Sequence, residues 1–124
     1  MSLQAYYGSL SASPELSAVN ISGLSTRHCN NTSGSCVNTF NMLATPVGGS
    51  GSYGYSWSLD GAPDSVELTN DDQPQCTVQV TADVEDPQNE VSIKLDVEVT
   101  DLLRLSDPPV TGTITLTSEH ELEI

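Results

Sequence analysis

The stretch that decides the fold is Val91-Ser92-Ile93-Lys94-Leu95-Asp96-Val97-Glu98-Val99-Thr100. Aliphatic residues occupy every second position, and polar or charged residues occupy the positions between them. Successive side chains of a strand point to opposite faces of a sheet, so this period predicts a strand with one face on a core and one in water. No part of the chain shows the apolar spacing of three and four residues that an amphipathic helix needs.

The same alternation recurs in six further segments, so the chain is predicted to form about seven short strands. Turn residues such as Asp60-Gly61, Asp86-Pro87 and Asp107-Pro108-Pro109 separate these segments. Short strands at this spacing predict an all-β fold, an immunoglobulin-like sandwich with Greek-key connections. The apolar positions of the six segments are Val19 and Ile21; Phe40, Met42 and Ala44; Tyr53, Tyr55, Trp57 and Leu59; Val66 and Leu68; Cys76, Val78, Val80 and Ala82; and Val110, Ile114 and Leu116.

One sandwich domain is predicted over residues 16–124, preceded by an N-terminal arm or edge strand over residues 1–15. Two stretches of small polar residues, 27–35 and 48–52, are predicted to be loops. The predicted core consists of the residues that share the apolar phase of their strands: Phe40, Tyr55, Trp57, Leu68, Val78, Val80, Ile93, Leu95, Val97, Ile114 and Leu116.

The segment from Gly51 to Gly61, GSYGYSWSLDG, carries a likeness to a known family. An aromatic residue two positions before Trp57, followed by a turn, resembles the third strand of bacterial and phage immunoglobulin-like modules, including the polycystic-kidney-disease-like (PKD-like) group. The stretch from Val91 to Asp101 resembles their long sixth strand. The resemblance implies an immunoglobulin-like fold, and such modules serve adhesins, accessory domains of enzymes and virus particles. The PKD group usually has a more acidic turn after this tryptophan, whereas this chain has Ser58-Leu59 before Asp60, so no ligand residues carry over.

The charge balance excludes two classes of partner. The chain has 17 Asp and Glu against 3 Lys and Arg, a formal net charge of -14. Its only fixed cations, Arg27, Lys94 and Arg104, cannot form the basic patch that binding to nucleic acid or to an anionic membrane needs. Any self-association into a homo-oligomer must use uncharged contact faces, because like copies repel.

The ends of the chain show no targeting or spanning segment. No apolar run approaches ~20 residues, the length that crosses a bilayer. The start, Met1-Ser2-Leu3-Gln4, lacks the basic and apolar regions of a secretory signal. Three explanations stay open: the protein remains in the cell, a signal has been removed, or the protein leaves inside an assembled virus particle.

Three cysteines invite chemical hypotheses. Cys29 and Cys36 flank a polar loop and are candidates for a disulfide, with two free thiols as the alternative. Cys76 lies on the apolar phase of its strand and is predicted to pack as a small hydrophobic residue. A structural zinc site needs four ligands, and beside His28 and the two cysteines the fourth is missing unless distant His120 folds back. No metal site and no cofactor are therefore expected.

Other candidate sites have ordinary structural explanations. Six loop carboxylates could meet at one end of the sandwich and hold calcium, but Asp also favours turns for backbone reasons. The tail 119–123 is predicted to be a solvated end. The stripe of Tyr53, Tyr55 and Trp57 is predicted to belong to the core instead of forming a sugar platform. The six carboxylates are Asp60, Asp64, Asp71, Asp72, Glu85 and Asp86.

These observations favour a binding protein over an enzyme, because no paired nucleophile and base, phosphate loop or metal motif is present. The hypothesis is a structural or decoration protein of a bacteriophage particle, made in the host cytoplasm and bound to a capsid or tail protein of the virion. The alternative is a carbohydrate- or protein-binding adhesion module of a bacterial surface or secreted protein.

Attachment is predicted to use the N-terminal arm and one end of the sandwich, and to avoid the charged strand faces. Leu3, Tyr6, Tyr7 and Leu10 are poor choices for a permanently solvated tail, and tyrosine supplies contact area at low entropic cost. An extended arm could add a strand to a partner's sheet edge. The alternative is that residues 1–15 form the first strand of the domain's own sheet.

Overall fold

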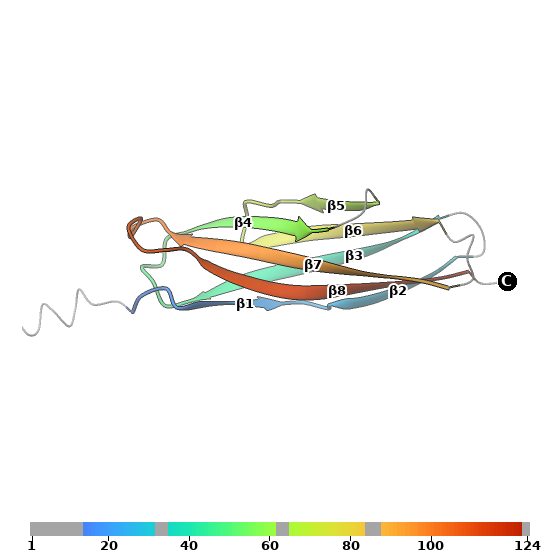
Figure 1. The fold of residues 1–124 in the computed structure, drawn as a ribbon, viewed down its shortest axis with the longest axis horizontal. Coiled ribbons are helices and arrows are strands. Elements are labelled where there is room, and N and C mark those ends of the chain that lie inside the picture. Colours follow the sequence, from blue (N-terminus) through green and yellow to red (C-terminus); the bar gives the residue numbers. More distant parts are fainter. Residues whose placement is uncertain (1–13, 32–34, 62–64, 84–87, 123–124) are drawn as a thin grey trace, which may run out of the picture.

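The computed structural model describes residues 14–31, 35–61, 65–83 and 88–122. Within these ranges the chain forms eight strands and no helix, so none that could span a membrane. Figure 1 shows an elongated sandwich whose long strands run side by side. The strands are β1 (Ala18–Ser22), β2 (Thr26–Asn31), β3 (Ser35–Val47), β4 (Tyr53–Asp60), β5 (Val66–Thr69), β6 (Gln75–Asp83), β7 (Gln88–Asp101) and β8 (Val110–Leu122).

The strands form two four-stranded sheets, β1-β3-β6-β5 and β2-β8-β7-β4. Every pairing is antiparallel except β2 with β8, which is parallel. An immunoglobulin domain of the constant type places its first, second, fourth and fifth strands in one sheet and its third, sixth and seventh in the other. The same order appears here once the first strand is split into β1 and β2, one for each sheet. The predicted immunoglobulin-like sandwich is therefore confirmed.

The crossing from β1 to β2 explains why eight strands appear where about seven were predicted. It occurs at Gly23, whose φ of 139° disfavours side chains. A Cβ atom at this position would lie 2.5 Å from the carbonyl oxygen of Asn41 and 2.8 Å from Sδ of Met42. Only glycine lets the chain pass this close to β3 and change sheets.

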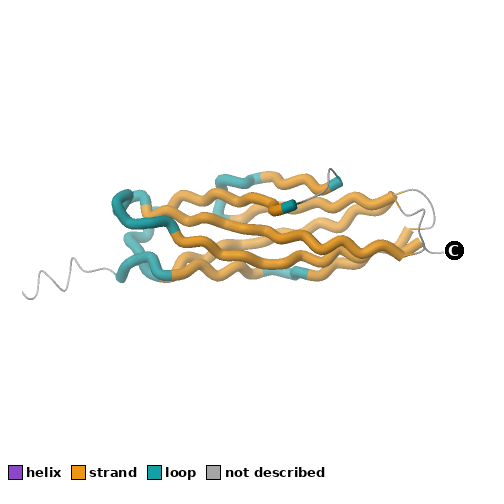
Figure 2. Tube along the Cα trace, viewed as in Figure 1, coloured by secondary structure: helices purple, strands orange, loops and turns teal. Residues whose placement is uncertain are grey.

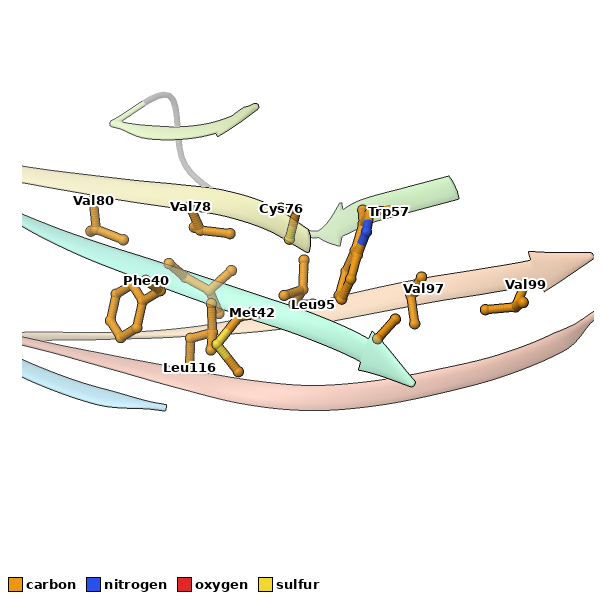
Figure 3. Close-up of a cluster of buried hydrophobic side chains, with 12 residues drawn as sticks. Phe40, Met42, Trp57, Cys76, Val78, Val80, Leu95, Val97, Val99 and Leu116 are labelled. Carbon is orange, nitrogen blue, oxygen red and sulfur yellow. The ribbon is translucent and has the colours of Figure 1, made fainter. Parts of the chain in front are cut away.

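The core lies between the two sheets, and Figure 3 shows its side chains converging there. Eight of the eleven predicted core residues are buried, while Tyr55, Leu68 and Ile114 are partly buried and pack against the cluster. Cys76 is fully buried, as predicted, and burial raises the pKa of its thiol to about 12. The whole cluster comprises Phe40, Met42, Ala44, Trp57, Cys76, Val78, Val80, Ile93, Leu95, Val97, Val99 and Leu116.

Two predictions about polar segments were wrong. Much of the predicted loop 27–35 belongs to β2, which pairs in parallel with β8 from Thr26 with Thr117 to Asn31 with Leu122. Residues 119–122 of the predicted solvated tail form the end of β8, and His120 among them is fully buried. Both errors have one cause: backbone hydrogen bonds between β2 and β8 hold segments whose side chains show no apolar alternation.

Candidate attachment surface at the loop end

The end of the sandwich at which the described chain begins carries two loops, drawn in teal in Figure 2. One connects β3 to β4 and spans residues 48–52; the other connects β7 to β8 and spans residues 102–109. We call these two loops together the tip. Gly48 and Gly49 have φ angles of 82° and 88°, a region that favours glycine, so the first loop turns sharply.

A buried carboxylate joins the two loops. Asp101, only 3% exposed, accepts hydrogen bonds from the Ser50 amide at 2.9 Å, the Ser50 hydroxyl at 2.5 Å and the Leu103 amide at 3.1 Å. The Ser50 hydroxyl is the main cause that holds the pKa of the Asp101 carboxyl below its ordinary value, against the opposing effect of burial. A carboxylate with three donors fixes the tip in one conformation.

Backbone hydrogen bonds complete the second loop. The Leu102 amide donates to the Ser52 carbonyl at 2.9 Å, and the Arg104 amide donates to the Asp101 carbonyl at 3.0 Å. The Asp107 amide donates in turn to the Arg104 carbonyl at 2.9 Å. These bonds define the loop conformation without using its aliphatic side chains.

Three leucines project from this ordered loop into solvent. Leu102 is 47% exposed, and Leu103 and Leu105 are each 72% exposed. Burying a leucine side chain stabilises a protein or complex by about 1.5–3 kcal/mol. Since the loop conformation is set by Asp101 and the backbone, these leucines are available to a partner without a change in the domain.

The N-terminal segment joins the domain at this same end. The carbonyl oxygen of Pro14 accepts hydrogen bonds from the Gly49 amide at 2.6 Å and from the Arg104 guanidinium at 3.3 Å. The predicted attachment residues, Leu3, Tyr6, Tyr7 and Leu10, lie outside the described residues, as does the part of the predicted arm before Pro14. The described chain therefore begins, at Pro14, in direct contact with the tip.

The tip leucines were missed by sequence reasoning, although a signal was present. The sequence Leu102-Leu103-Arg104-Leu105 places apolar residues where the alternation of β7 stops and a Pro-Pro turn follows. Apolar residues in a turn without strand phase are candidates for an exposed surface, because no sheet face remains for them to cover.

The other end of the sandwich holds the cysteine pair. The structure joins Cys29 of β2 to Cys36 of β3 in a disulfide, with their Cα atoms 6.2 Å apart. Because β2 and β3 belong to different sheets, the bridge links the two layers. His120 of β8 lies against both sulfurs, and burial first, then the charge of His28, lowers the pKa of its imidazole.

The loop carboxylates do not form a site among the described residues. There the cysteines and His120 are the only group of three or more metal-ligand residues with ligand atoms close together. Asp60 instead lies 3.8 Å from the Lys94 ammonium, in an exposed ion pair. Asp64, Glu85 and Asp86 lie outside the described residues.

Comparisons with known proteins add little beyond the fold. No family model and no curated protein matched the sequence. Among solved structures, the chain is similar to the ASH / PapD-like domain of human CEP192 (PapD-like domain 7). The TM-score is 0.48 at 10% sequence identity, over 89% of this chain and 88% of that one. A likeness this distant says nothing about what the chain binds.

Proposed function

We propose that this chain is a structural protein that decorates a bacteriophage particle, bound through its tip and N-terminal segment to a capsid or tail protein. The observation that carries the proposal is the set of exposed leucines, Leu102, Leu103 and Leu105, on a loop fixed by buried Asp101. The proposed role is binding, because the tip presents apolar contact area to solvent.

The charge distribution favours the tip over the strand faces as the attachment surface. Residues 102–109 contain one Arg and one Asp, and residues 48–52 contain no charge, so the tip is neutral on a chain of net charge -14. On β7, by contrast, Lys94 and Glu98 are exposed. Burying such a face would strand charges away from water, whereas burying the tip would remove mainly leucine surface.

The resemblance to phage and bacterial immunoglobulin-like modules supports a particle surface as the partner. The same resemblance includes adhesins, so the alternative is an adhesion module that binds carbohydrate or protein at a cell surface. A homo-oligomer would also have to use an uncharged surface, and the tip provides one. The three hypotheses predict different partners for the same leucines: a particle protein, a carbohydrate or protein at a cell surface, or a second copy of the chain.

The test is reconstitution on particles that lack the chain. Purified protein is mixed with particles from a deletion strain, and the bound fraction is measured by co-sedimentation. We expect wild-type protein to bind, and the double variant Leu103→Asp/Leu105→Asp and the deletion of residues 1–12 each to lose at least tenfold in affinity. The matched control is Leu43→Asp, an exposed leucine on the outer face of β3, which should bind normally.

The controls separate attachment from folding. All three altered proteins should keep the wild-type circular dichroism spectrum, since Leu43, Leu103 and Leu105 are exposed and residues 1–12 precede the first described residue, Pro14. Undiminished binding by the double variant would contradict the tip as the attachment surface. Binding of wild-type protein to host cells but not to particles would instead favour the adhesion module.

A further inference from the structure

The disulfide end of the sandwich contains a group of ligand atoms that the attachment function does not use. The Nδ1 atom of His120 lies 3.1 Å from Sγ of Cys29 and 3.2 Å from Sγ of Cys36. The three residues come from three strands: β2, β3 and β8. Two sulfurs and one imidazole nitrogen within 4.8 Å of one another are a ligand set that thiophilic metal ions prefer.

The imidazole is held in one orientation by a chain of hydrogen bonds. Its other nitrogen, Nε2, lies 2.6 Å from the Ser118 hydroxyl, which accepts a hydrogen bond from the Asn38 amide at 2.8 Å. All three side chains are buried. When Nε2 carries the proton and donates to Ser118, the lone pair of Nδ1 points at the two sulfurs. Metal-binding histidines are oriented in this way, by a partner on the nitrogen that does not bind the metal.

We propose that Cys29, Cys36 and His120 form a binding site for Zn²⁺ when the disulfide is reduced. Tetrahedral zinc, with Zn–S distances of about 2.3 Å and Zn–N distances of about 2.0–2.1 Å, places sulfurs about 3.8 Å apart and each about 3.5 Å from the nitrogen. The Cα atoms of the cysteines are 6.2 Å apart, so their sulfurs reach that separation by side-chain rotation. The sulfur-to-nitrogen distances need to grow by only a few tenths of an ångström.

Conversion of the disulfide into a zinc-binding pair of thiolates requires an external two-electron reductant. A phosphine transfers two electrons to the S–S bond and becomes a phosphine oxide with oxygen from water, and the two sulfurs take up two protons as thiols. Zn²⁺ then replaces both thiol protons, which pass to solvent. Cys29 and Cys36 are only partly buried, so a water molecule completes the fourth position, as in zinc sites with three protein ligands.

The sequence expectation of no metal rested on the lack of a fourth ligand unless distant His120 folds back. The parallel pairing of β2 with β8 brings His120 to the cysteines, directly opposite Cys29 in register, and the resulting group has three protein ligands. The inference is independent of the attachment function, since the site lies at the end of the sandwich opposite the tip (Figure 1).

The test uses the full chain with its three cysteines reduced by tris(carboxyethyl)phosphine and counted with a thiol reagent. Zn²⁺ is titrated in competition with a chromophoric chelator, and Co²⁺ serves as a spectroscopic probe. We expect one ion per chain, a sulfur-to-cobalt charge-transfer band, and a higher melting temperature with zinc. Cys29→Ser and Cys36→Ser should abolish binding and the band, and His120→Gln should weaken binding at least a hundredfold.

Two further variants separate a built site from adventitious thiol binding. Ser118→Ala removes only the group that orients His120 and should weaken zinc binding about 10–100-fold; Asn38 keeps the carbonyls of Arg27 and Glu119 as acceptors. Cys76→Ala, a buried cysteine away from the site, should bind zinc like the wild type. Zinc affinity that is unchanged in His120→Gln or Ser118→Ala, or a reduced chain that binds no zinc or stays unfolded with it, would overturn the proposal.

Discussion

Replacement of Trp57 by alanine tests the packing of the two sheets. Trp57 is the single tryptophan of the chain and is 3% exposed in the core of β4. Its indole N–H donates a hydrogen bond of 2.7 Å to the Gln73 carbonyl, and its backbone amide donates one of 2.8 Å to the Asp71 carbonyl. The side chain therefore fills the core and also fastens the connection between β5 and β6 to the open edge of β4.

The expected cost follows from that burial. A buried aromatic side chain removes about 150–250 Å² from water, which corresponds to about 4–6 kcal/mol at about 25 cal/mol per Å². An alanine side chain retains part of this burial free energy, and substitutions of a buried aromatic residue by alanine typically cost about 3–5 kcal/mol. We expect Trp57→Ala to lower the free energy of unfolding by that amount and the melting temperature by about 10–20 °C.

The assay is urea unfolding with the disulfide intact, followed by circular dichroism because the variant lacks tryptophan fluorescence. Trp57→Phe keeps an aromatic ring but not the hydrogen bond to Gln73, so its free energy of unfolding should lie between those of Trp57→Ala and the wild type. Leu103→Ala is the matched control at an exposed position and should change stability by less than about 0.5 kcal/mol. A loss below about 1 kcal/mol in Trp57→Ala would refute the sheet packing described here.

Three other substitutions probe separate parts of the fold. Gly112→Ala should cost about 1–3 kcal/mol in urea unfolding, because its Cβ would lie 2.8 Å from Cγ1 of Val19 and press β1 away from β8; no loss would contradict this packing. Cys29→Ser/Cys36→Ser should lower the free energy of unfolding by about 2–3 kcal/mol, because the disulfide closes a loop between residues seven apart and so restricts the unfolded chain. Unchanged stability in this variant would contradict the bridge. Asp101→Asn should lower the melting temperature at neutral pH. Because the folded-state pKa of Asp101 is lowered, its contribution to stability is complete above the unfolded-state pKa of about 3.9 and is lost as the pH falls through the lower folded-state value. The difference in melting temperature between variant and wild type should therefore shrink in acid, and a difference that grows in acid would contradict this prediction.

The sequence predicted the parts of this fold that depend on side-chain period. The alternation from Val91 to Thr100 identified β7, and similar alternation placed the core residues of β3, β4, β6 and β8. It did not predict β2, because that strand is held by backbone pairing with a partner about 90 residues away. The same long-range pairing buries His120, so the group it forms with the cysteines was not foreseeable from spacing.

The candidate attachment surface was predictable only in outline. The charged strand faces favoured a sandwich end as the attachment surface, and the apolar residues of the arm favoured a contact through the N-terminal segment. Which end this would be depends on where Pro14 meets Gly49 and Arg104, a contact between three distant parts of the chain. The exposure of the tip leucines depends in turn on Asp101, whose three donors cannot be assigned from sequence.

The central claim, that the chain is a decoration protein of a virus particle, is tested most directly by counting its copies in gradient-purified particles. Quantitative mass spectrometry against the major capsid protein gives the number of chains per particle. We predict a fixed copy number that persists through high-salt washing, because attachment through leucines is weakly screened by salt. Absence of the chain from the particles, or a copy number that falls to zero on washing, would contradict the claim.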